Sequence, residues 1–250
     1  MVCDISSVFS RSFVLSVDNR RLGWFHEHME SVFGNSGFYV PPRVVRGYTS
    51  LELGGRLPAL RIAKAHIDIV KRARDMKFPS VMVFEDDALP RPDAVECMRH
   101  HLSNLPDDCG VFQMGSTIRL KVAQDQVNEL LRVGRVLGAH AYIIFADAYD
   151  AFINRFHHGP FAPIDEYFAR VATTYIPTYD IFIQYDPARR RNGGYYCNEP
   201  VVGGYAPSGF LSPSDTVVLG FQQTFSPERV EQARNRLKDV VPAPWQLRKE

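Results

Sequence analysis

The sequence lacks a dominant charge and a long apolar run, and each absence excludes a class of protein. Its 29 Lys and Arg residues nearly balance 28 Asp and Glu residues, which leaves a formal net charge of +1 at pH 7. This balance argues against a nucleic-acid binder that acts through bulk charge, and against an acidic, self-repelling disordered chain. No apolar run approaches the roughly 18 residues that a membrane span needs. Residues 1–11 show no signal peptide, so we expect a cytoplasmic protein, with the inner face of a membrane as the alternative.

The cysteines are few and too scattered to form a recognisable metal or redox motif. Cys3, Cys97, Cys109 and Cys197 form no C-x-x-C pair, and no histidine stands at metal-ligand spacing from them. A chain of 250 residues can bury a sizeable core without disulfide bonds. We therefore expect reduced thiols and no zinc site.

Apolar runs of strand length alternate with segments in which apolar residues recur at helical spacing. The clearest helix pattern covers 58–75, where Leu60, Ala63, Ile67 and Val70 form one stripe. The expected strands are 12–17, 43–48 (strand or loop), 80–84, 110–114, 139–146 and 173–185, and the expected helices are 20–33, 58–75, 94–102, 148–156, 164–171 and 226–240. No repeat or linker divides the chain. We expect one α/β domain over residues 1–250, with a central sheet flanked by helices and an irregular C-terminal third.

Three consecutive acids follow one of these strands, a continuously apolar run. The run SVMVF at 80–84 is typical of an interior strand covered on both faces, and Glu85, Asp86 and Asp87 come directly after it. Ligands of open α/β sheets bind beyond the carboxyl ends of the strands. Adjacent carboxylates repel each other unless a cation lies among them, and Mg²⁺ or Mn²⁺ commonly combines one or two carboxylates with phosphate oxygens. The alternative is a solvated turn whose acids precede a helix; the position after an interior strand favours the metal site.

Several short motifs occur together in an order that resembles a known family. They are FVLSVDNRR (13–21), AKAHIDIVKRA (63–73), VMVFEDDA (81–88), GAHAYIIF (138–145), PIDEYF (163–168) and IPTYDIFIQ (176–184). This order and spacing resemble glycosyltransferase family 25, the lipopolysaccharide- and collagen-type galactosyltransferases of GT-A fold. The chain departs from the family pattern at Ala65, where the family has Ser before the histidine, and the segment after Asp186 does not match.

The resemblance implies a GT-A-like, Rossmann-type domain with a mixed central sheet. Its donor-binding half would cover about 12–115, its acceptor-side half about 116–225, and its last helix about 226–240. The implied activity is metal-dependent, inverting transfer of a hexose from a nucleotide sugar, a UDP-sugar by the resemblance, to a hydroxyl acceptor. The implied cofactor is Mn²⁺ or Mg²⁺. The acceptor would be a glycan, a lipid-linked molecule or another hydroxyl compound.

The resemblance also implies roles for the residues of the DxD-like triplet. Asp87 would bind the metal that bridges the two phosphates, and Glu85 would share that metal or approach the ribose or sugar of the donor. Asp86 would orient its neighbours or contact the sugar.

Residues 16–21, at the end of the first strand, would complete the donor site. Ser16 and Val17 would hold the uracil and ribose. Arg20 or Arg21 would pair with phosphate, and a solvated arginine at a helix start is the alternative.

Inversion requires a base that deprotonates the acceptor hydroxyl, and Asp165 matches the family's Pro-x-Asp position. The alternatives are that Asp165 is a helix N-cap and that the adjacent Glu166 is the base. His140 is expected near the donor sugar. His66 lies within the apolar stripe of 58–75, so we expect a core histidine that supports the acid-bearing strand, with direct ligation as the alternative.

Arg189–Arg191 is the single basic run, and it is either a solvated loop or a contact for an anionic acceptor such as a phosphorylated glycan or modified nucleic acid. Two other functions stay open at this point. A nucleotidyltransferase would also use acidic metal ligands, although VDNRRLGW (17–24) supplies no Gly-rich, Lys-bearing phosphate loop. A non-catalytic glycan-binding relative is the other alternative, and the complete acid triplet argues against it.

Overall fold

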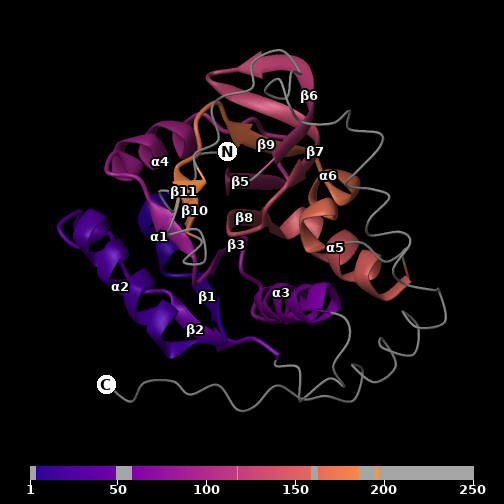
Figure 1. Cartoon of the computed structure of the whole chain (residues 1–250). Coiled ribbons are helices and arrows are strands. Elements are labelled where there is room, and N and C mark those ends of the chain that lie inside the picture. Colours follow the sequence, from indigo (N-terminus) through magenta and orange to yellow (C-terminus); the bar gives the residue numbers. More distant parts are fainter. Residues whose placement is uncertain (1–3, 49–57, 117, 159–162, 186–194, 197–250) are drawn as a thin grey trace.

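A computed structural model of the chain shows a mixed sheet between two layers of helices (Figure 1). It describes residues 4–48, 58–116, 118–158, 163–185 and 195–196. The elements in chain order are α1 (Ile5–Phe9), β1 (Ser12–Ser16), α2 (Asn19–Phe33), β2 (Arg43–Arg46), α3 (Pro58–Asp75), β3 (Ser80–Glu85), β4 (Ala88–Pro90), α4 (Ala94–Ser103), β5 (Val111–Gly115), β6 (Ile118–Val127), β7 (Leu130–Leu137), β8 (Ala141–Phe145), α5 (Ala146–His158), the 3₁₀ helix η1 (Ile164–Glu166), α6 (Phe168–Val171), β9 (Thr174–Pro177), β10 (Phe182–Tyr185) and β11 (Tyr195–Tyr196).

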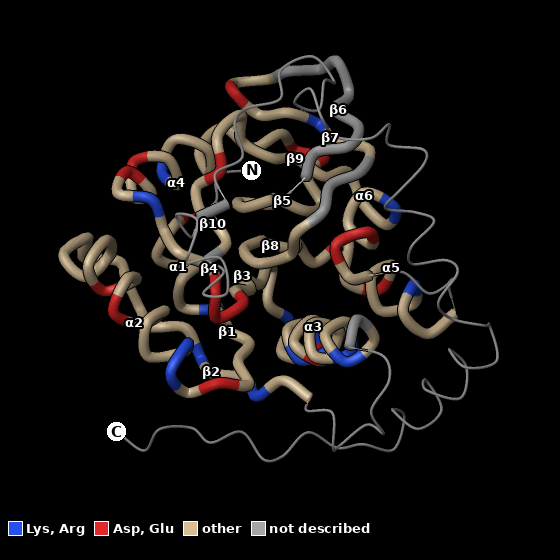
Figure 2. The backbone as a smooth tube through the Cα atoms, viewed as in Figure 1, with Lys and Arg blue, Asp and Glu red and all other residues tan. Residues whose placement is uncertain are grey.

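The main sheet has eight strands in the order β2-β1-β3-β8-β5-β9-β7-β6. The pairs β1–β2, β1–β3 and β5–β9 are parallel and the other neighbours are antiparallel. The predicted α/β class, with a mixed central sheet flanked by helices, is therefore confirmed. Figure 2 shows that the central strands β3, β5 and β8 carry hardly any charge, as their sequences SVMVFE, VFQMG and AYIIF require.

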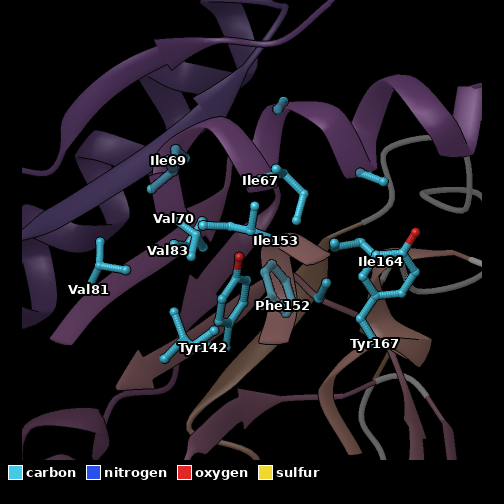
Figure 3. Packing of buried hydrophobic residues seen from close by; sticks show 14 of the residues in the cluster. Ile67, Ile69, Val70, Val81, Val83, Tyr142, Phe152, Ile153, Ile164 and Tyr167 are labelled. Atoms are coloured by element: carbon cyan, nitrogen blue, oxygen red, sulfur yellow. The ribbon is translucent and has the colours of Figure 1, made fainter. Parts of the chain in front are cut away.

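Alternation along β3 divides the core between the two faces of the sheet. Val81 and Val83 pack with residues of α3 and α5, whereas Met82 and Phe84 pack with residues of α1, α2 and α4. Figure 3 shows the first of these clusters, in which Ile67 of α3 lies over the side chains from the sheet. The four residues that define the apolar stripe predicted on 58–75 are all buried, namely Leu60, Ala63, Ile67 and Val70.

The strand order reverses at β1, and this reversal places the functional edge of the sheet. The chain passes from β1 through α2 to β2 on one side, and then through α3 to β3 on the other side of β1. Helices α2 and α3 contribute to opposite core clusters and so cover opposite faces. The carboxyl ends of β1 and β3 therefore border the crevice that forms where strand order reverses in open α/β sheets.

A small second sheet, in the order β11-β10-β4, adjoins this edge. Strand β4 begins one residue after the acid triplet and runs antiparallel to β10, with Ala88 opposite Gln184. This pairing brings residues about 100 positions apart in the sequence to the end of β3.

The structure differs from the sequence predictions at two places, and other predicted segments lie outside the described residues. The hairpin β6–β7 was not predicted, although residues 118–122 alternate between apolar and polar side chains. Its turn residues Asn128 and Glu129 have positive φ angles of 49° and 62°. Strand β8 begins at Ala141 and not at 139. The helix expected at 226–240, the basic run Arg189–Arg191 and nearly all of 186–225 lie outside the described residues. Among the helices described, none has the length and apolar character of a membrane span.

Candidate active site

The three acids leave the sheet at the end of β3, and hydrogen bonds from neighbouring strands fix their backbone. The amide of Glu85 donates to the carbonyl oxygen of His140 at 2.8 Å, and the amide of Asp86 donates to that of Leu15 at 3.0 Å. His140 precedes β8, which runs antiparallel to β3, so its position at this edge follows from the strand register. Figure 2 shows the acidic segment beside β3 and β4.

Glu85 points toward the α3 side of the sheet, where His66 contacts it. The distance from His66 Nε2 to Glu85 Oε1 is 3.1 Å, and His66 Nδ1 lies 2.9 Å from the hydroxyl of Tyr142. A carboxylate can only accept, so Nε2 carries the proton and Nδ1 accepts from the tyrosine hydroxyl. His66 is fully buried, which confirms the expected core histidine beneath the acid-bearing strand.

The surroundings keep Glu85 ionised and Tyr142 protonated. Burial acts to raise the pKa of the Glu85 carboxyl, but the hydrogen bond from His66 and nearby positive charge outweigh burial and hold that pKa below its usual value. Burial, with the charge of Glu85 as a second cause, raises the pKa of Tyr142 well above its usual value. The chain Tyr142–His66–Glu85 therefore holds this carboxylate through two successive hydrogen bonds between buried groups.

Asp86 and Asp87 face a different set of partners. The hydroxyl of Ser16, at the end of β1, donates to Asp86 Oδ2 at 2.6 Å. Arg21 Nη2, in the first turn of α2, lies 2.6 Å from Asp86 Oδ1 and 2.9 Å from Asp87 Oδ2. The side-chain amide of Gln184 in β10 donates to Asp87 Oδ2 at 3.1 Å.

The surroundings of Asp87 strongly raise the pKa of its carboxyl. Burial, reinforced by the negative charge of Glu85, raises its pKa to about 7 despite the opposing effects of Arg21 and Gln184. Its second oxygen, Oδ1, is buried and has no hydrogen-bond partner among the described residues. Burial also raises the pKa of Asp86, against the effects of Ser16 and Arg21. A buried carboxylate oxygen without a partner is suited to a cation ligand.

His140 is fully buried beside the acids. Its Nε2 donates to the carbonyl oxygen of Phe182 at 3.1 Å, while Nδ1 has no partner in the described part of the chain. Burial lowers the pKa of His140, so the ring is neutral and Nδ1 is a bare acceptor. Gly115 is required here, because a Cβ at that position would lie 2.2 Å from His140 Nε2. The strand begins only at Ala141, so the expectation that His140 lies within a strand is wrong.

Asp165 lies in η1 and is tied to the same edge of the sheet. Its Oδ2 accepts from the amide of Gly138 at 2.8 Å, and its Oδ1 accepts from the amide of Glu166 at 3.0 Å. Burial raises its pKa to about 6, partly offset by the hydrogen bond from Gly138. The N-cap of η1 is Pro163, which removes the N-cap alternative, and Glu166 is paired with Arg170 at 2.6 Å.

The other predicted donor contacts lie between the end of β1 and the first turn of α2. Val17 is 60% exposed and Arg20 is exposed, whereas Arg21 turns toward the acids. Asp18, which the sequence analysis did not single out, is the N-cap of α2 and accepts from the amides of Arg20 and Arg21. An Asp directly before a helical pattern is a recognised start signal and could have identified it.

Gln184 is the other residue to which no role was assigned, although it ends the motif IPTYDIFIQ (176–184). It reaches Asp87 only because β10 pairs with β4 in the small sheet. Within the described residues, no three His, Cys, Asp or Glu side chains converge as a ready-made metal site.

Comparisons with known proteins give fold-level similarities only. A scan against protein-family models and a search of curated proteins each find no match. Among solved structures, a mutant of Drosophila β1,4-galactosyltransferase 7 in complex with manganese, UDP-Gal and xylobiose is 16% identical, with 72% of each chain covered and a TM-score of 0.44. A protein of STIV is 16% identical, with 70% of this chain and 83% of that chain covered and a TM-score of 0.40. A glycosyltransferase involved in glycosylation of the major capsid of PBCV-1 is 11% identical, with 66% and 80% covered and a TM-score of 0.38. TM-scores below 0.5 do not establish a shared function, so function has to be argued from the site.

Proposed function

We propose that this protein is a metal-dependent, inverting glycosyltransferase of GT-A type that moves a hexose from a nucleotide sugar, a UDP-sugar, to a hydroxyl acceptor. One observation carries the proposal. At the crevice where strand order reverses, Asp86 and Asp87 share the guanidinium of Arg21, Glu85 directly precedes them, and a buried oxygen of Asp87 has no partner among the described residues.

The donor side of the proposal rests on the α2 side of the sheet. Asp87, through Oδ1, would hold Mn²⁺ or Mg²⁺, and Glu85 is the second predicted ligand. Two carboxylates leave most coordination positions to water and to donor phosphates, which is the usual arrangement for these cations. When bound, the cation neutralises charge on the departing nucleoside diphosphate. Ser16 and Val17 would contact the nucleoside.

Asp165 is the proposed base. A pKa of about 6 leaves it ionised at neutral pH and still able to take a proton from an attacking hydroxyl. Asp165 accepts a hydrogen bond from the amide of Gly138, which lies two positions before His140 in the chain. The Nδ1 atom of His140, which has no partner among the described residues, would accept a hydrogen bond from a hydroxyl of the donor sugar. The acceptor itself, a glycan, a lipid-linked compound or an anionic molecule, stays a prediction.

The direct test measures UDP release from a panel of UDP-hexoses with and without Mn²⁺. We expect metal-stimulated turnover by the wild type and a loss of about a thousandfold in Asp87→Asn, since that change removes the proposed metal carboxylate. Asp150→Asn is the control, because its carboxylate is 76% exposed and pairs only with Arg74 among the contacts described. Turnover without metal stimulation would refute the metal-dependent reaction, and release of pyrophosphate from nucleoside triphosphates would indicate a nucleotidyltransferase instead.

A further inference from the structure

Arg21 is the charged partner that two of the acids share. One nitrogen, Nη2, lies within 2.9 Å of both Asp86 and Asp87, whose side chains are only 6% and 12% exposed. The other partners described for these carboxylates, Ser16 and Gln184, are neutral. The side chain of Arg21 is itself 32% exposed, so it reaches the acids from the solvent side.

The start of α2 fixes the base of this side chain. Asp18 caps the helix and accepts from the backbone amide of Arg21, while Ser16 binds both Asp86 and the backbone around Asp18. The guanidinium is thus delivered to the acids by a rigid turn. Its ion pairs can nevertheless be exchanged for others, since they involve only the end of a long side chain.

A divalent cation bound to Asp87 would share a carboxylate with this guanidinium. Two positive groups a few ångströms apart repel each other strongly where burial limits screening. Arg21 already compensates part of the carboxylate charge that would attract a metal ion. A metal ion alone therefore meets a less favourable site than it would without this guanidinium.

A nucleoside diphosphate removes this conflict, because its phosphate oxygens can accept from the guanidinium in place of the carboxylates. We propose that Arg21 is an internal counter-ion that disfavours metal binding in the absence of nucleotide and transfers to the diphosphate when nucleotide and metal arrive together. Metal ion and diphosphate then bind with positive cooperativity, of which this side chain supplies the larger part and direct contact between cation and phosphate the smaller part. This inference rests on the proposed function and adds the order in which its ligands assemble.

The test is a linkage measurement on the full chain. Free Mn²⁺ is measured by electron paramagnetic resonance with and without UDP, corrected for the Mn²⁺–UDP complex that forms in buffer. For the wild type we expect UDP to tighten Mn²⁺ binding by about tenfold or more, and Mn²⁺ to tighten UDP binding by the same factor. Inorganic pyrophosphate should reproduce the effect and uridine should not, because the contact is with phosphate.

Arg21→Gln separates the counter-ion role from a merely structural ion pair. We expect the variant to bind Mn²⁺ alone about tenfold more tightly than the wild type, and the coupling with UDP to fall to about twofold. Arg20→Gln removes the same charge from the adjacent, exposed position, and its Mn²⁺ affinity and coupling should stay within about twofold of the wild type.

The outcomes distinguish this inference from the proposed function. Unchanged Mn²⁺ affinity and coupling in Arg21→Gln would overturn the counter-ion role, while the metal site would stand if Asp87→Asn still abolished Mn²⁺-dependent UDP binding. Equal effects of Arg20→Gln and Arg21→Gln would also overturn it. If Arg21→Gln did not fold, the wild-type measurement would decide: an absence of coupling with both UDP and pyrophosphate refutes the inference.

Discussion

At the carboxyl end of β3, the two sides of the sheet hold neighbouring carboxylates in different ways. On the α3 side, Glu85 is held by a hydrogen bond from His66, which is in turn hydrogen-bonded to Tyr142, and His66 and Tyr142 are both fully buried. On the α2 side, Asp86 and Asp87 are held by Arg21, which is partly exposed. A buried hydrogen-bonded chain fixes the position of a charge, whereas an ion pair at the edge of the site can be exchanged for the charges of a ligand.

The difference suggests a division of labour. The α3 side, which also carries Asp165 through η1, would provide fixed geometry for the transfer step. The α2 side would provide charge that responds to metal and diphosphate. Changes on the two sides should therefore affect different measured quantities.

The largest effect is expected for Asp165→Asn, which removes the proposed base. Transfer should fall by about 10²- to 10⁴-fold while UDP binding is retained. In the wild type the rate should rise with pH through about 6, because the base acts only when deprotonated, and this limb should disappear in the variant. A pH–rate profile of transfer, with UDP titration alongside, measures both.

Stability responds to this carboxyl with the opposite sign. The pKa of Asp165 is raised from 3.8 to about 6, so its contribution to stability is complete below pH 3.8 and is lost as pH rises through about 6.

Normal transfer by Asp165→Asn would show that Asp165 is not the base. A loss of transfer in Glu166→Gln as large as the loss in Asp165→Asn would also contradict the assignment.

His66→Ala should have the next largest effect, and it tests the rigid side. The change leaves Glu85 and Tyr142 without their shared partner and opens a cavity, so unfolding free energy should fall by about 2–4 kcal/mol. The transfer rate should fall and Mn²⁺ should bind more weakly, because Glu85 is the second proposed metal ligand, while Mn²⁺–UDP coupling should persist because Arg21 keeps its contacts with Asp86 and Asp87. Urea unfolding and the linkage measurement check these expectations.

Two matched variants sharpen this prediction. Tyr142→Phe removes only the end of the chain and should cost about 1 kcal/mol. His100→Ala, on a histidine that is 50% exposed, should change stability by less than about 0.5 kcal/mol. Loss of Mn²⁺–UDP coupling in His66→Ala would show that the two sides of β3 do not act separately.

The smallest effect is expected for Ser16→Ala on the charged side. The variant loses the 2.6 Å hydrogen bond to Asp86, but Arg21 still compensates that carboxylate. We expect a loss of about 1 kcal/mol in unfolding free energy and little change in the rate-limiting transfer step. Urea unfolding measures the first and saturating-donor kinetics the second. A loss above about 3 kcal/mol would mean that Ser16, and not Arg21, is the main support of Asp86.

The strands and helices nearest the site were largely predictable because their residues have strong periodicity. The apolar run 80–84 became β3, and the stripe on 58–75 became α3 with His66 inside the core. The hairpin β6–β7 was missed although residues 118–122 (IRLKV) alternate between apolar and charged side chains, which is a strand pattern. Its turn is formed by Asn128 and Glu129, not by the Asn-Gly or Asp-Gly pair that marks a hairpin most clearly. Strand β8 was predicted, but its first residue depends on pairing with β3 and β5, which local pattern does not contain.

The sequence by itself determined that three acids follow an interior strand, and that Asp165, His140 and Arg21 occur in motifs of a recognisable order. Only the tertiary structure decided which partner each acid receives. Because side chains alternate along β3 and the strand order reverses at β1, Glu85 points toward His66, whereas Asp86 and Asp87 contact Arg21. The pairing of β4 with β10 adds Gln184. Local sequence sets backbone periodicity, but the charge environment of a side chain depends on residues brought together by packing across distant elements.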